Sequence, residues 1–199
     1  MTPTAVEIDK YLPATWTAPG MSEAEFVELC SKFPEAMVEY TADGTVIVMP
    51  PTDPNTGRRV KEVVKQLAIW ADRDGRGDVC GPDSGFRFPD GSRFAPDAAW
   101  MDLARWTKAG ASGERFPVFA PEFVVEVRSP DDRLRTLRDK MESYIANGVQ
   151  LAWLIDPQER SVTVYRPGQV PQLIDKPASM AGEGPVEGFV LDLSRVLGS

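Results

Sequence analysis

Residues 121–157, PEFVVEVRSPDDRLRTLRDKMESYIANGVQLAWLIDP, predict a strand, a helix and a second strand in succession. The first strand, residues 122–128, is rich in valine, which is typical of a strand buried on both faces. Glu126 stands in the middle of this apolar run. Because burying a carboxylate without a partner costs several kcal/mol, the sequence predicts that another group compensates the charge of Glu126.

The helix predicted over residues 131–147 has signals at both ends. Ser129 suits the N-cap, Pro130 suits the first helical position, and Asp132 completes a Ser-x-x-Asp capping box. Gly148 marks the end of the helix. One apolar stripe runs along it, made of Leu134, Leu137, Met141, Tyr144 and Ile145. At about 100° per residue, Lys140 lies at the edge of this stripe and can return its ammonium to the sheet.

A second acid, Asp97, stands in a similar apolar setting in RFAPDAAWM, residues 93–101. Because side chains alternate along a strand, Asp97 shares a face with the small residues Ala95 and Ala99. Glu126 likewise shares a face with Val124, so two strands can bring both acids to one point on a sheet. A hard divalent cation would take oxygen ligands from such a pair and offset the cost of burying them.

The absence of histidine limits the possible chemistry. It excludes Ser-His-Asp and Cys-His nucleophilic sites, histidine-based zinc sites and nucleases that use histidine as a base. The net charge of −8 argues against a nonspecific nucleic-acid binder, although it leaves room for a local basic cleft. Any hydrolysis must therefore use carboxylates, lysine, hydroxyl groups and a metal ion such as Mg²⁺ or Mn²⁺.

Cellular location is indicated by the cysteines and by the N-terminus. Cys30 and Cys80 are too few for a disulfide framework and are expected to be reduced thiols in a cytoplasmic protein. The N-terminal MTPTAVEIDK does not resemble a signal peptide, and no apolar run reaches the roughly 20 residues of a membrane span.

The remaining segments complete an α/β pattern. Residues 22–34 predict a short helix with a Ser22–Glu25 capping box, and residues 36–50 predict a hairpin around Asp43 and Gly44. A longer helix follows over residues 57–75, then strands over residues 78–88 and 93–101. Residues 102–117 predict a loop with some helix, and residues 158–199 predict edge strands and a terminal turn. The fold class is therefore α/β with a mixed sheet flanked by helices.

The order of these elements resembles a known superfamily. An Asp on one strand, a Glu on the next strand and a following helix is the pattern of the PD-(D/E)XK nucleases. The segments PDAAW and VVEVRSPDDRL…DKMESYIANGVQLAWLIDP are similar to its Uma family of restriction endonucleases, and the resemblance covers residues 33–157. It implies a restriction-endonuclease-like fold and metal-dependent hydrolysis of DNA, with Asp97 and Glu126 as metal ligands.

The position of the lysine departs from the superfamily pattern. The residue two places after the Glu is Arg128, a fixed cation that cannot serve as a neutral base. In the Uma family the lysine stands on the following helix, and Lys140 matches that position. The resemblance therefore implies a catalytic Asp97, Glu126 and Lys140, while from the residues alone a catalytic lysine and a solvated helix lysine are both open for Lys140. A structural ion pair is the preferred interpretation of Arg128.

Two further acids could join the site. Glu39, in the first strand of the predicted hairpin, corresponds to a Glu of the Uma pattern; a residue lining the site and a solvent-facing strand residue are both open. Glu62, on the helix over residues 57–75, matches an additional metal-site Glu of some superfamily members. A charge pair with Arg58, Arg59 or Lys65 is the preferred interpretation of Glu62.

Three functional hypotheses remain. The first is a Mg²⁺-dependent endodeoxyribonuclease that acts as a homodimer, and the second is a catalytically inactive binding or assembly module with the same fold. A structural homodimer, in which the acids only pair with basic residues, is the third. In all three, residues 1–199 form one domain, with a helix and hairpin extension over residues 1–56, a nuclease-like core over 57–157 and C-terminal strands over 158–199.

Overall fold

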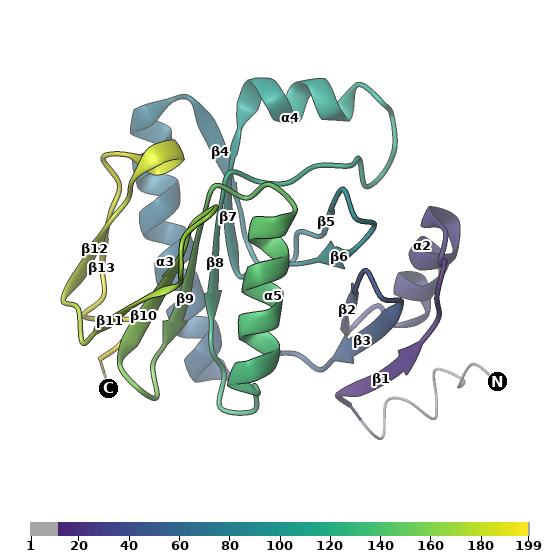
Figure 1. The fold of residues 1–199 in the computed structure, drawn as a ribbon, viewed down its shortest axis with the longest axis horizontal. Coiled ribbons are helices and arrows are strands. Elements are labelled where there is room, and N and C mark those ends of the chain that lie inside the picture. Colours follow the sequence, from purple (N-terminus) through teal and green to yellow (C-terminus); the bar gives the residue numbers. More distant parts are fainter. Residues whose placement is uncertain (1–11, 199) are drawn as a thin grey trace.

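The computed structural model describes residues 12–198 and contains a mixed six-stranded sheet, the larger sheet (Figure 1). From one edge to the other its strands are β11 (Gln172–Asp175), β10 (Ser161–Tyr165), β9 (Leu151–Asp156), β8 (Phe123–Val127), β7 (Ala98–Asp102) and β4 (Gly77–Cys80). β8 and β9 are parallel, whereas the other neighbours are antiparallel. The predicted fold class, a mixed α/β sheet flanked by helices, is confirmed.

Helices cover both faces of the larger sheet. α3 (Pro54–Asp74) packs on one face through Val63 and Leu67, together with β12 (Ser179–Ala181), η1 (Gly184–Val186) and β13 (Val190–Asp192). α5 (Leu134–Ala146) packs on the opposite face through Met141 and Tyr144. In β8, Phe123, Val125 and Val127 face the α3 side, and Val124 faces the α5 side. This alternation agrees with the prediction and places Glu126 beneath α5.

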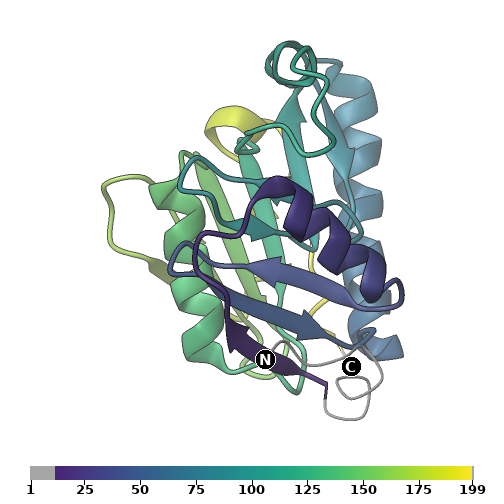
Figure 2. The same ribbon diagram turned by 90° about the vertical axis from the view of Figure 1, so that its right-hand side faces the viewer.

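A second sheet, here called the N-terminal sheet, lies beside α5 (Figures 1 and 2). Its strand order is β1 (Ala14–Thr17), β3 (Thr45–Met49), β2 (Met37–Tyr40), β6 (Arg93–Phe94) and β5 (Phe86–Arg87). α2 (Glu23–Lys32) covers one face of this sheet with a separate apolar cluster that includes Phe26, Leu29 and Val48. The hairpin of β2 and β3 therefore shares a sheet with β5 and β6, which come from the middle of the chain.

Local sequence signals explain where α2 begins and where α3 begins and ends. Ser22 and Glu25 form the predicted capping box of α2. Asp53 caps α3 by accepting hydrogen bonds from the backbone N–H groups of Asn55 and Thr56, so this helix begins a few residues before the predicted start. Gly75 ends α3 at φ 73°, a left-handed conformation that glycine adopts without steric cost.

The two strands predicted over residues 78–88 and 93–101 are each divided between the two sheets. β4 and β7 belong to the larger sheet, whereas β5 and β6 belong to the N-terminal sheet. Pro82 and Pro96 lie in the connections. Because proline lacks the N–H group that a central strand must donate, both strands break at these positions. The chain therefore leaves the larger sheet after β4 and returns to it at β7.

The predicted start of α5 is also wrong. The helix begins at Leu134, and its N-cap, Arg133, makes no side-chain cap hydrogen bond. The Ser129 N–H instead donates to Asp132 Oδ2 over 2.7 Å, and the Asp132 N–H donates to the carbonyl oxygen of Ser129 over 3.3 Å. The Ser-x-x-Asp pattern therefore closes a separate turn between β8 and α5.

The other predicted segments are found with small changes. α4 (Leu103–Gly110) occupies half of the predicted loop and is capped by Asp102. β10 is an inner strand rather than an edge strand, because β11 pairs with its outer side. The N-terminal ten residues, predicted not to be a signal peptide, lie outside the described residues. Between residues 12 and 198, every helix is too short or too polar to cross a bilayer.

Candidate active site

The two acids singled out in the sequence lie on the same face of the larger sheet. β7 and β8 pair antiparallel, with Ala98 opposite Val125 and Ala99 opposite Val124. Extending this register by one residue places Asp97 opposite Glu126, where the Cβ atoms of paired residues are typically about 4.5–5.5 Å apart. Ala99 and Val124 both pack on the α5 side, so the two carboxylates face α5 together.

Asp97 is the more accessible of the two acids. Its side chain is half-buried, and its Oδ2 accepts a hydrogen bond from the backbone N–H of Val127 over 2.7 Å. Burial, and next the negative charge of Glu126, raise the pKa of Asp97 to about 8. Without a metal ion, Asp97 therefore holds a proton near neutral pH. A cation placed between the two acids would displace this proton.

Glu126 is only 5% exposed, and one of its two oxygens is fully engaged. Its Oε1 accepts a hydrogen bond from the Tyr144 hydroxyl over 2.7 Å and lies 2.8 Å from Lys140 Nζ. Burial raises the pKa of Glu126, and the positive charge of Lys140 opposes that rise. The cost of burying Glu126 is thus offset by two partners, both carried by α5.

Lys140 joins Glu126 to Glu39, which β2 contributes. The Lys140 Nζ lies 2.8 Å from an oxygen of each carboxylate, and its side chain is 12% exposed. Burial lowers the pKa of Lys140, but the charges of Glu126 and Glu39 raise it more, and the net pKa lies above the usual value for lysine. The two carboxylates therefore favour the protonated form of Lys140.

Glu39 is an inward-facing member of this cluster and not a solvent-facing strand residue. It is 3% exposed, and its Oε1 also accepts a hydrogen bond from the backbone N–H of Ala95 over 3.0 Å. Its neighbours Val38 and Tyr40 point the other way, into the apolar cluster under α2. Glu39 therefore ties the N-terminal sheet both to α5 and to the segment that leads to Asp97.

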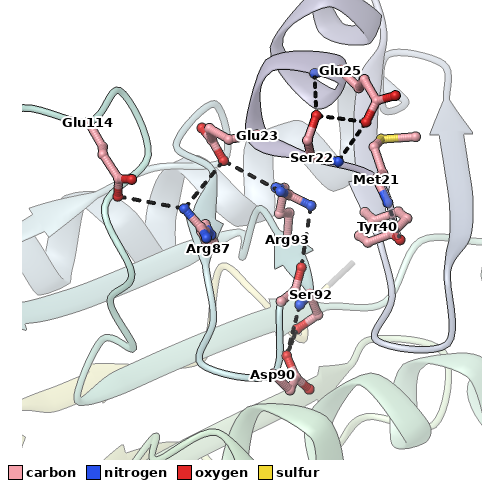
Figure 3. Close-up of polar contacts among 11 residues, drawn as sticks. Met21, Ser22, Glu23, Glu25, Tyr40, Arg87, Asp90, Ser92, Arg93 and Glu114 are labelled. Carbon is pink, nitrogen blue, oxygen red and sulfur yellow. Dashed lines mark hydrogen bonds and ion pairs between the residues drawn. The ribbon is translucent and has the colours of Figure 1, made fainter. Parts of the chain in front are cut away.

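A polar network joins α2 to the N-terminal sheet, whose strand β2 carries Glu39 to its contact with Lys140 (Figure 3). Glu23 of α2 faces two arginines, with its Oε2 3.5 Å from Arg93 Nη2 and 3.8 Å from Arg87 Nη1. The Arg93 guanidinium also lies over the rings of Phe26 and Tyr40, at 4.8 and 5.3 Å from the ring centroids. α2, β2, β5 and β6 are thus joined beside the acid cluster.

Arg128 and Glu62 have partners elsewhere. Arg128 Nη1 lies 2.8 Å from Asp156 Oδ2, which is the structural ion pair preferred from the sequence. Glu62 pairs with Lys65 at 3.1 Å, as expected, and also lies 3.9 Å from Arg195. Because its helix, α3, covers the opposite face of the sheet, Glu62 is separated from Asp97 and Glu126.

The donor set of the cluster fits a small hard cation. Within residues 12–198, no group of three or more acids, cysteines or histidines is arranged to hold a metal, and Lys140 lies between the carboxylates of Glu39 and Glu126. No hydrogen bond among these residues engages Asp97 Oδ1 or Glu126 Oε2. Mg²⁺ usually takes one or two carboxylates, with water and substrate phosphate completing its shell, so two free oxygens suffice.

Sequence reasoning missed Tyr144 as a member of the cluster. It belongs to the apolar stripe of α5, and its ring packs in the core with 0% exposure. Its hydroxyl, however, donates to Glu126. The signal was present in the sequence, since a tyrosine at a buried helix position needs a hydrogen-bond partner for its hydroxyl. The pKa of Tyr144 lies well above its usual value because of burial and the nearby carboxylates.

Comparison with known proteins identifies the fold and the family. A crystal structure of a putative nuclease belonging to DUF820 from Anabaena variabilis ATCC 29413 is 22% identical to this chain, with a TM-score of 0.73 over 89% of this chain and 97% of that one. The cryoEM structure of a DrdV–DNA complex matches at 14% identity with a TM-score of 0.36, over 61% of this chain and 83% of that one.

Among curated proteins, none matches this chain. Residues 23–194 match the Uma2 family, which is described as putative restriction endonuclease. This match covers more of the chain than the segment that carried the resemblance in the sequence. It includes β2 with Glu39, Asp97 before β7, β8 with Glu126, and α5 with Lys140. The chain therefore belongs to the Uma2 family of putative restriction endonucleases.

Proposed function

We propose that this protein is a Mg²⁺-dependent endodeoxyribonuclease in which Asp97 and Glu126 bind the metal and Lys140 stabilises charge on the phosphate. One observation carries the proposal. Two carboxylates, each with one free oxygen, face a buried lysine in a chain of this family. Mn²⁺ has the same ligand preferences and is expected to replace Mg²⁺.

Each group has a distinct part in the proposed reaction. A bound metal ion would polarise the scissile phosphate and lower the pKa of an attacking water. Lys140 remains protonated between Glu39 and Glu126, and it would place a fixed positive charge beside the phosphate oxygens. Glu39 orients Lys140 through their ion pair and through its own bond to the Ala95 N–H. Arg128 takes no part, because Asp156 holds it.

The test of this proposal compares wild-type protein with Asp97→Ala in the absence and presence of Mg²⁺. Wild type is expected to gain thermal stability on metal addition and to cut DNA only when metal is present, since a ligand that binds the native state stabilises it. Asp97→Ala is expected to lose both responses. A metal response without cleavage of any duplex or single-stranded DNA would favour the inactive binding module, and no metal response would favour the structural hypothesis.

The proposal includes a homodimer. A single chain of 199 residues with a net charge of −8 offers little surface for binding duplex DNA. In a dimer with two-fold symmetry, one active site would face each DNA strand. We expect light scattering at micromolar concentrations to give the mass of two chains. A monomer throughout that range would contradict this part of the proposal and leave the metal site unaffected.

The proposed location is the cytoplasm. The structure shows both Cys30 and Cys80 as free thiols, which suits a reducing compartment.

A further inference from the structure

Hydrogen bonds restrict the way in which each acid of the cluster can bind a cation. The Val127 N–H occupies one oxygen of Asp97, and the Tyr144 hydroxyl with Lys140 occupies one oxygen of Glu126. We propose that Tyr144 is a positioning residue that limits Glu126 to a single ligand oxygen and thereby sets the preference of the site for Mg²⁺ over Ca²⁺. The inference rests on the proposed function, because it takes Glu126 as a metal ligand.

The preference follows from the coordination chemistry of the two ions. Mg²⁺ requires six ligands in near-ideal octahedral geometry at about 2.0–2.1 Å, which single carboxylate oxygens supply well. Ca²⁺ accepts about six to eight oxygen ligands at about 2.3–2.6 Å and often uses both oxygens of one carboxylate. For Glu126 to bind in that second way, its Oε1 would have to give up or weaken one of its two contacts, which are with the Tyr144 hydroxyl and with Lys140. Tyr144 therefore penalises the mode of binding that suits Ca²⁺.

Tyr144 is held firmly enough to impose this restriction. The residue is 0% exposed, and its ring centroid lies 5.4 Å from that of Phe88 and 5.6 Å from that of Phe94. Because the ring is packed on several sides, the hydroxyl has little freedom to follow a carboxylate that rotates. Lys140 also contacts Glu126 Oε1, but it has a flexible side chain and is shared with Glu39.

The test is the Tyr144→Phe variant, which keeps the ring and removes the hydroxyl. Isothermal titration of DNA-free protein with MgCl₂, MnCl₂ and CaCl₂ gives the three dissociation constants without any need for cleavage. We expect the Mg²⁺ constant to rise about 10–100-fold, the usual cost of losing a residue that orients a metal ligand. The Ca²⁺ constant should change less, so the ratio of the Ca²⁺ constant to the Mg²⁺ constant should fall about tenfold or more.

A matched control separates orientation from packing. Tyr165→Phe removes a hydroxyl from the same apolar cluster, at a residue that is not among the hydrogen-bond partners of Asp97 and Glu126, and it should leave all three constants unchanged. Circular dichroism of the metal-free proteins verifies that both variants are folded. If Tyr144→Phe misfolds, titrations of wild type can still overturn the inference, because a wild type that binds Ca²⁺ as tightly as Mg²⁺ has no preference for Tyr144 to set.

The outcomes distinguish this inference from the proposed function. An unchanged ratio of the Ca²⁺ and Mg²⁺ constants in a folded Tyr144→Phe protein would overturn the role of Tyr144, even if the wild type cuts DNA. Conversely, a wild type that binds Mg²⁺ and cuts no DNA would overturn the nuclease, while a fallen ratio in Tyr144→Phe would still support the positioning role. A wild type that binds neither ion would overturn both.

Discussion

Replacing Lys140 with methionine is expected to reduce metal-dependent DNA cleavage by roughly 10²–10⁴-fold, the range for losing a charge-stabilising group. Methionine keeps an unbranched apolar side chain but removes the cation that lies 2.8 Å from both Glu39 and Glu126. Mg²⁺ binding should persist, because Asp97 and Glu126 remain. Initial rates on a plasmid or labelled oligonucleotide, measured at saturating Mg²⁺, give the reduction directly.

The same substitution should also destabilise the fold, since it leaves two buried carboxylates without a cation. Removing one partner of a buried ion pair typically costs about 3–5 kcal/mol. The double variant Glu39→Gln with Lys140→Met removes one of these charges and should recover much of the stability without recovering cleavage. That combination separates a role in cleavage from a role in folding, because a purely structural lysine would show recovery of both.

Two controls limit the interpretation. Lys108→Ala, an exposed lysine on α4, should leave cleavage unchanged. Lys140→Arg should restore only part of the activity, because a planar guanidinium differs in shape from the ammonium between two carboxylates. If Arg128→Ala abolished cleavage and Lys140→Met did not, the assignment of the cation to Lys140 would be wrong and Arg128 would take its place.

Asp97→Asn is expected to stabilise the metal-free protein while abolishing its response to Mg²⁺. The pKa of Asp97 is about 8 in the folded protein, against a reference value of 3.8. Between these pH values the native state holds a proton that the unfolded chain releases, so the free energy of unfolding of wild type falls as pH rises from about 4 to 8. Asparagine removes this titration and can still accept the hydrogen bond of the Val127 N–H.

The expected gain at pH 8 is roughly 2–4 kcal/mol, since a tenfold change in proton affinity corresponds to about 1.4 kcal/mol and the partial exposure of Asp97 reduces the effect. Urea unfolding in EDTA from pH 5 to 9 measures it, and Asp72→Asn, an exposed acid on α3, controls for the change in net charge. If the free energy of unfolding depends on pH in the same way for wild type and Asp97→Asn, the pKa of Asp97 is not raised by its surroundings.

The sequence predicted the positions of Glu126 and Lys140 because these depend on local periodicity. The alternation of β8 gave the face of Glu126, and the stripe of α5 gave the edge position of Lys140. The start of α5 was wrong because Ser129 and Asp132 make the same kind of local hydrogen bonds in a turn as in a capped helix. Only the packing of the following residues decides between the two.

The contact between Glu39 and Lys140 could not be predicted from spacing. It depends on the docking of the N-terminal sheet beside α5, which involves residues from distant parts of the chain. The divided strands are a different case, since Pro82 and Pro96 already disfavoured two long central strands. Tyr144 also carried a signal in the sequence, because a buried tyrosine hydroxyl needs a hydrogen-bond partner. The helical stripe alone did not indicate which residue that partner is.

The 101-residue separation between Glu39 and Lys140 has a consequence for biosynthesis. Synthesis proceeds from the N-terminus, domains generally fold as units, and contacts between residues distant in the sequence form slowly. A nascent chain exposes Glu39 and Asp97 well before α5 is synthesised, and β9, which pairs with β8, follows later still. The acids therefore emerge before their cation, and an unfinished chain lacks the complete cluster. If the proposed nuclease activity is present, a chain truncated before α5 would lack Lys140 and Tyr144 and would not carry it.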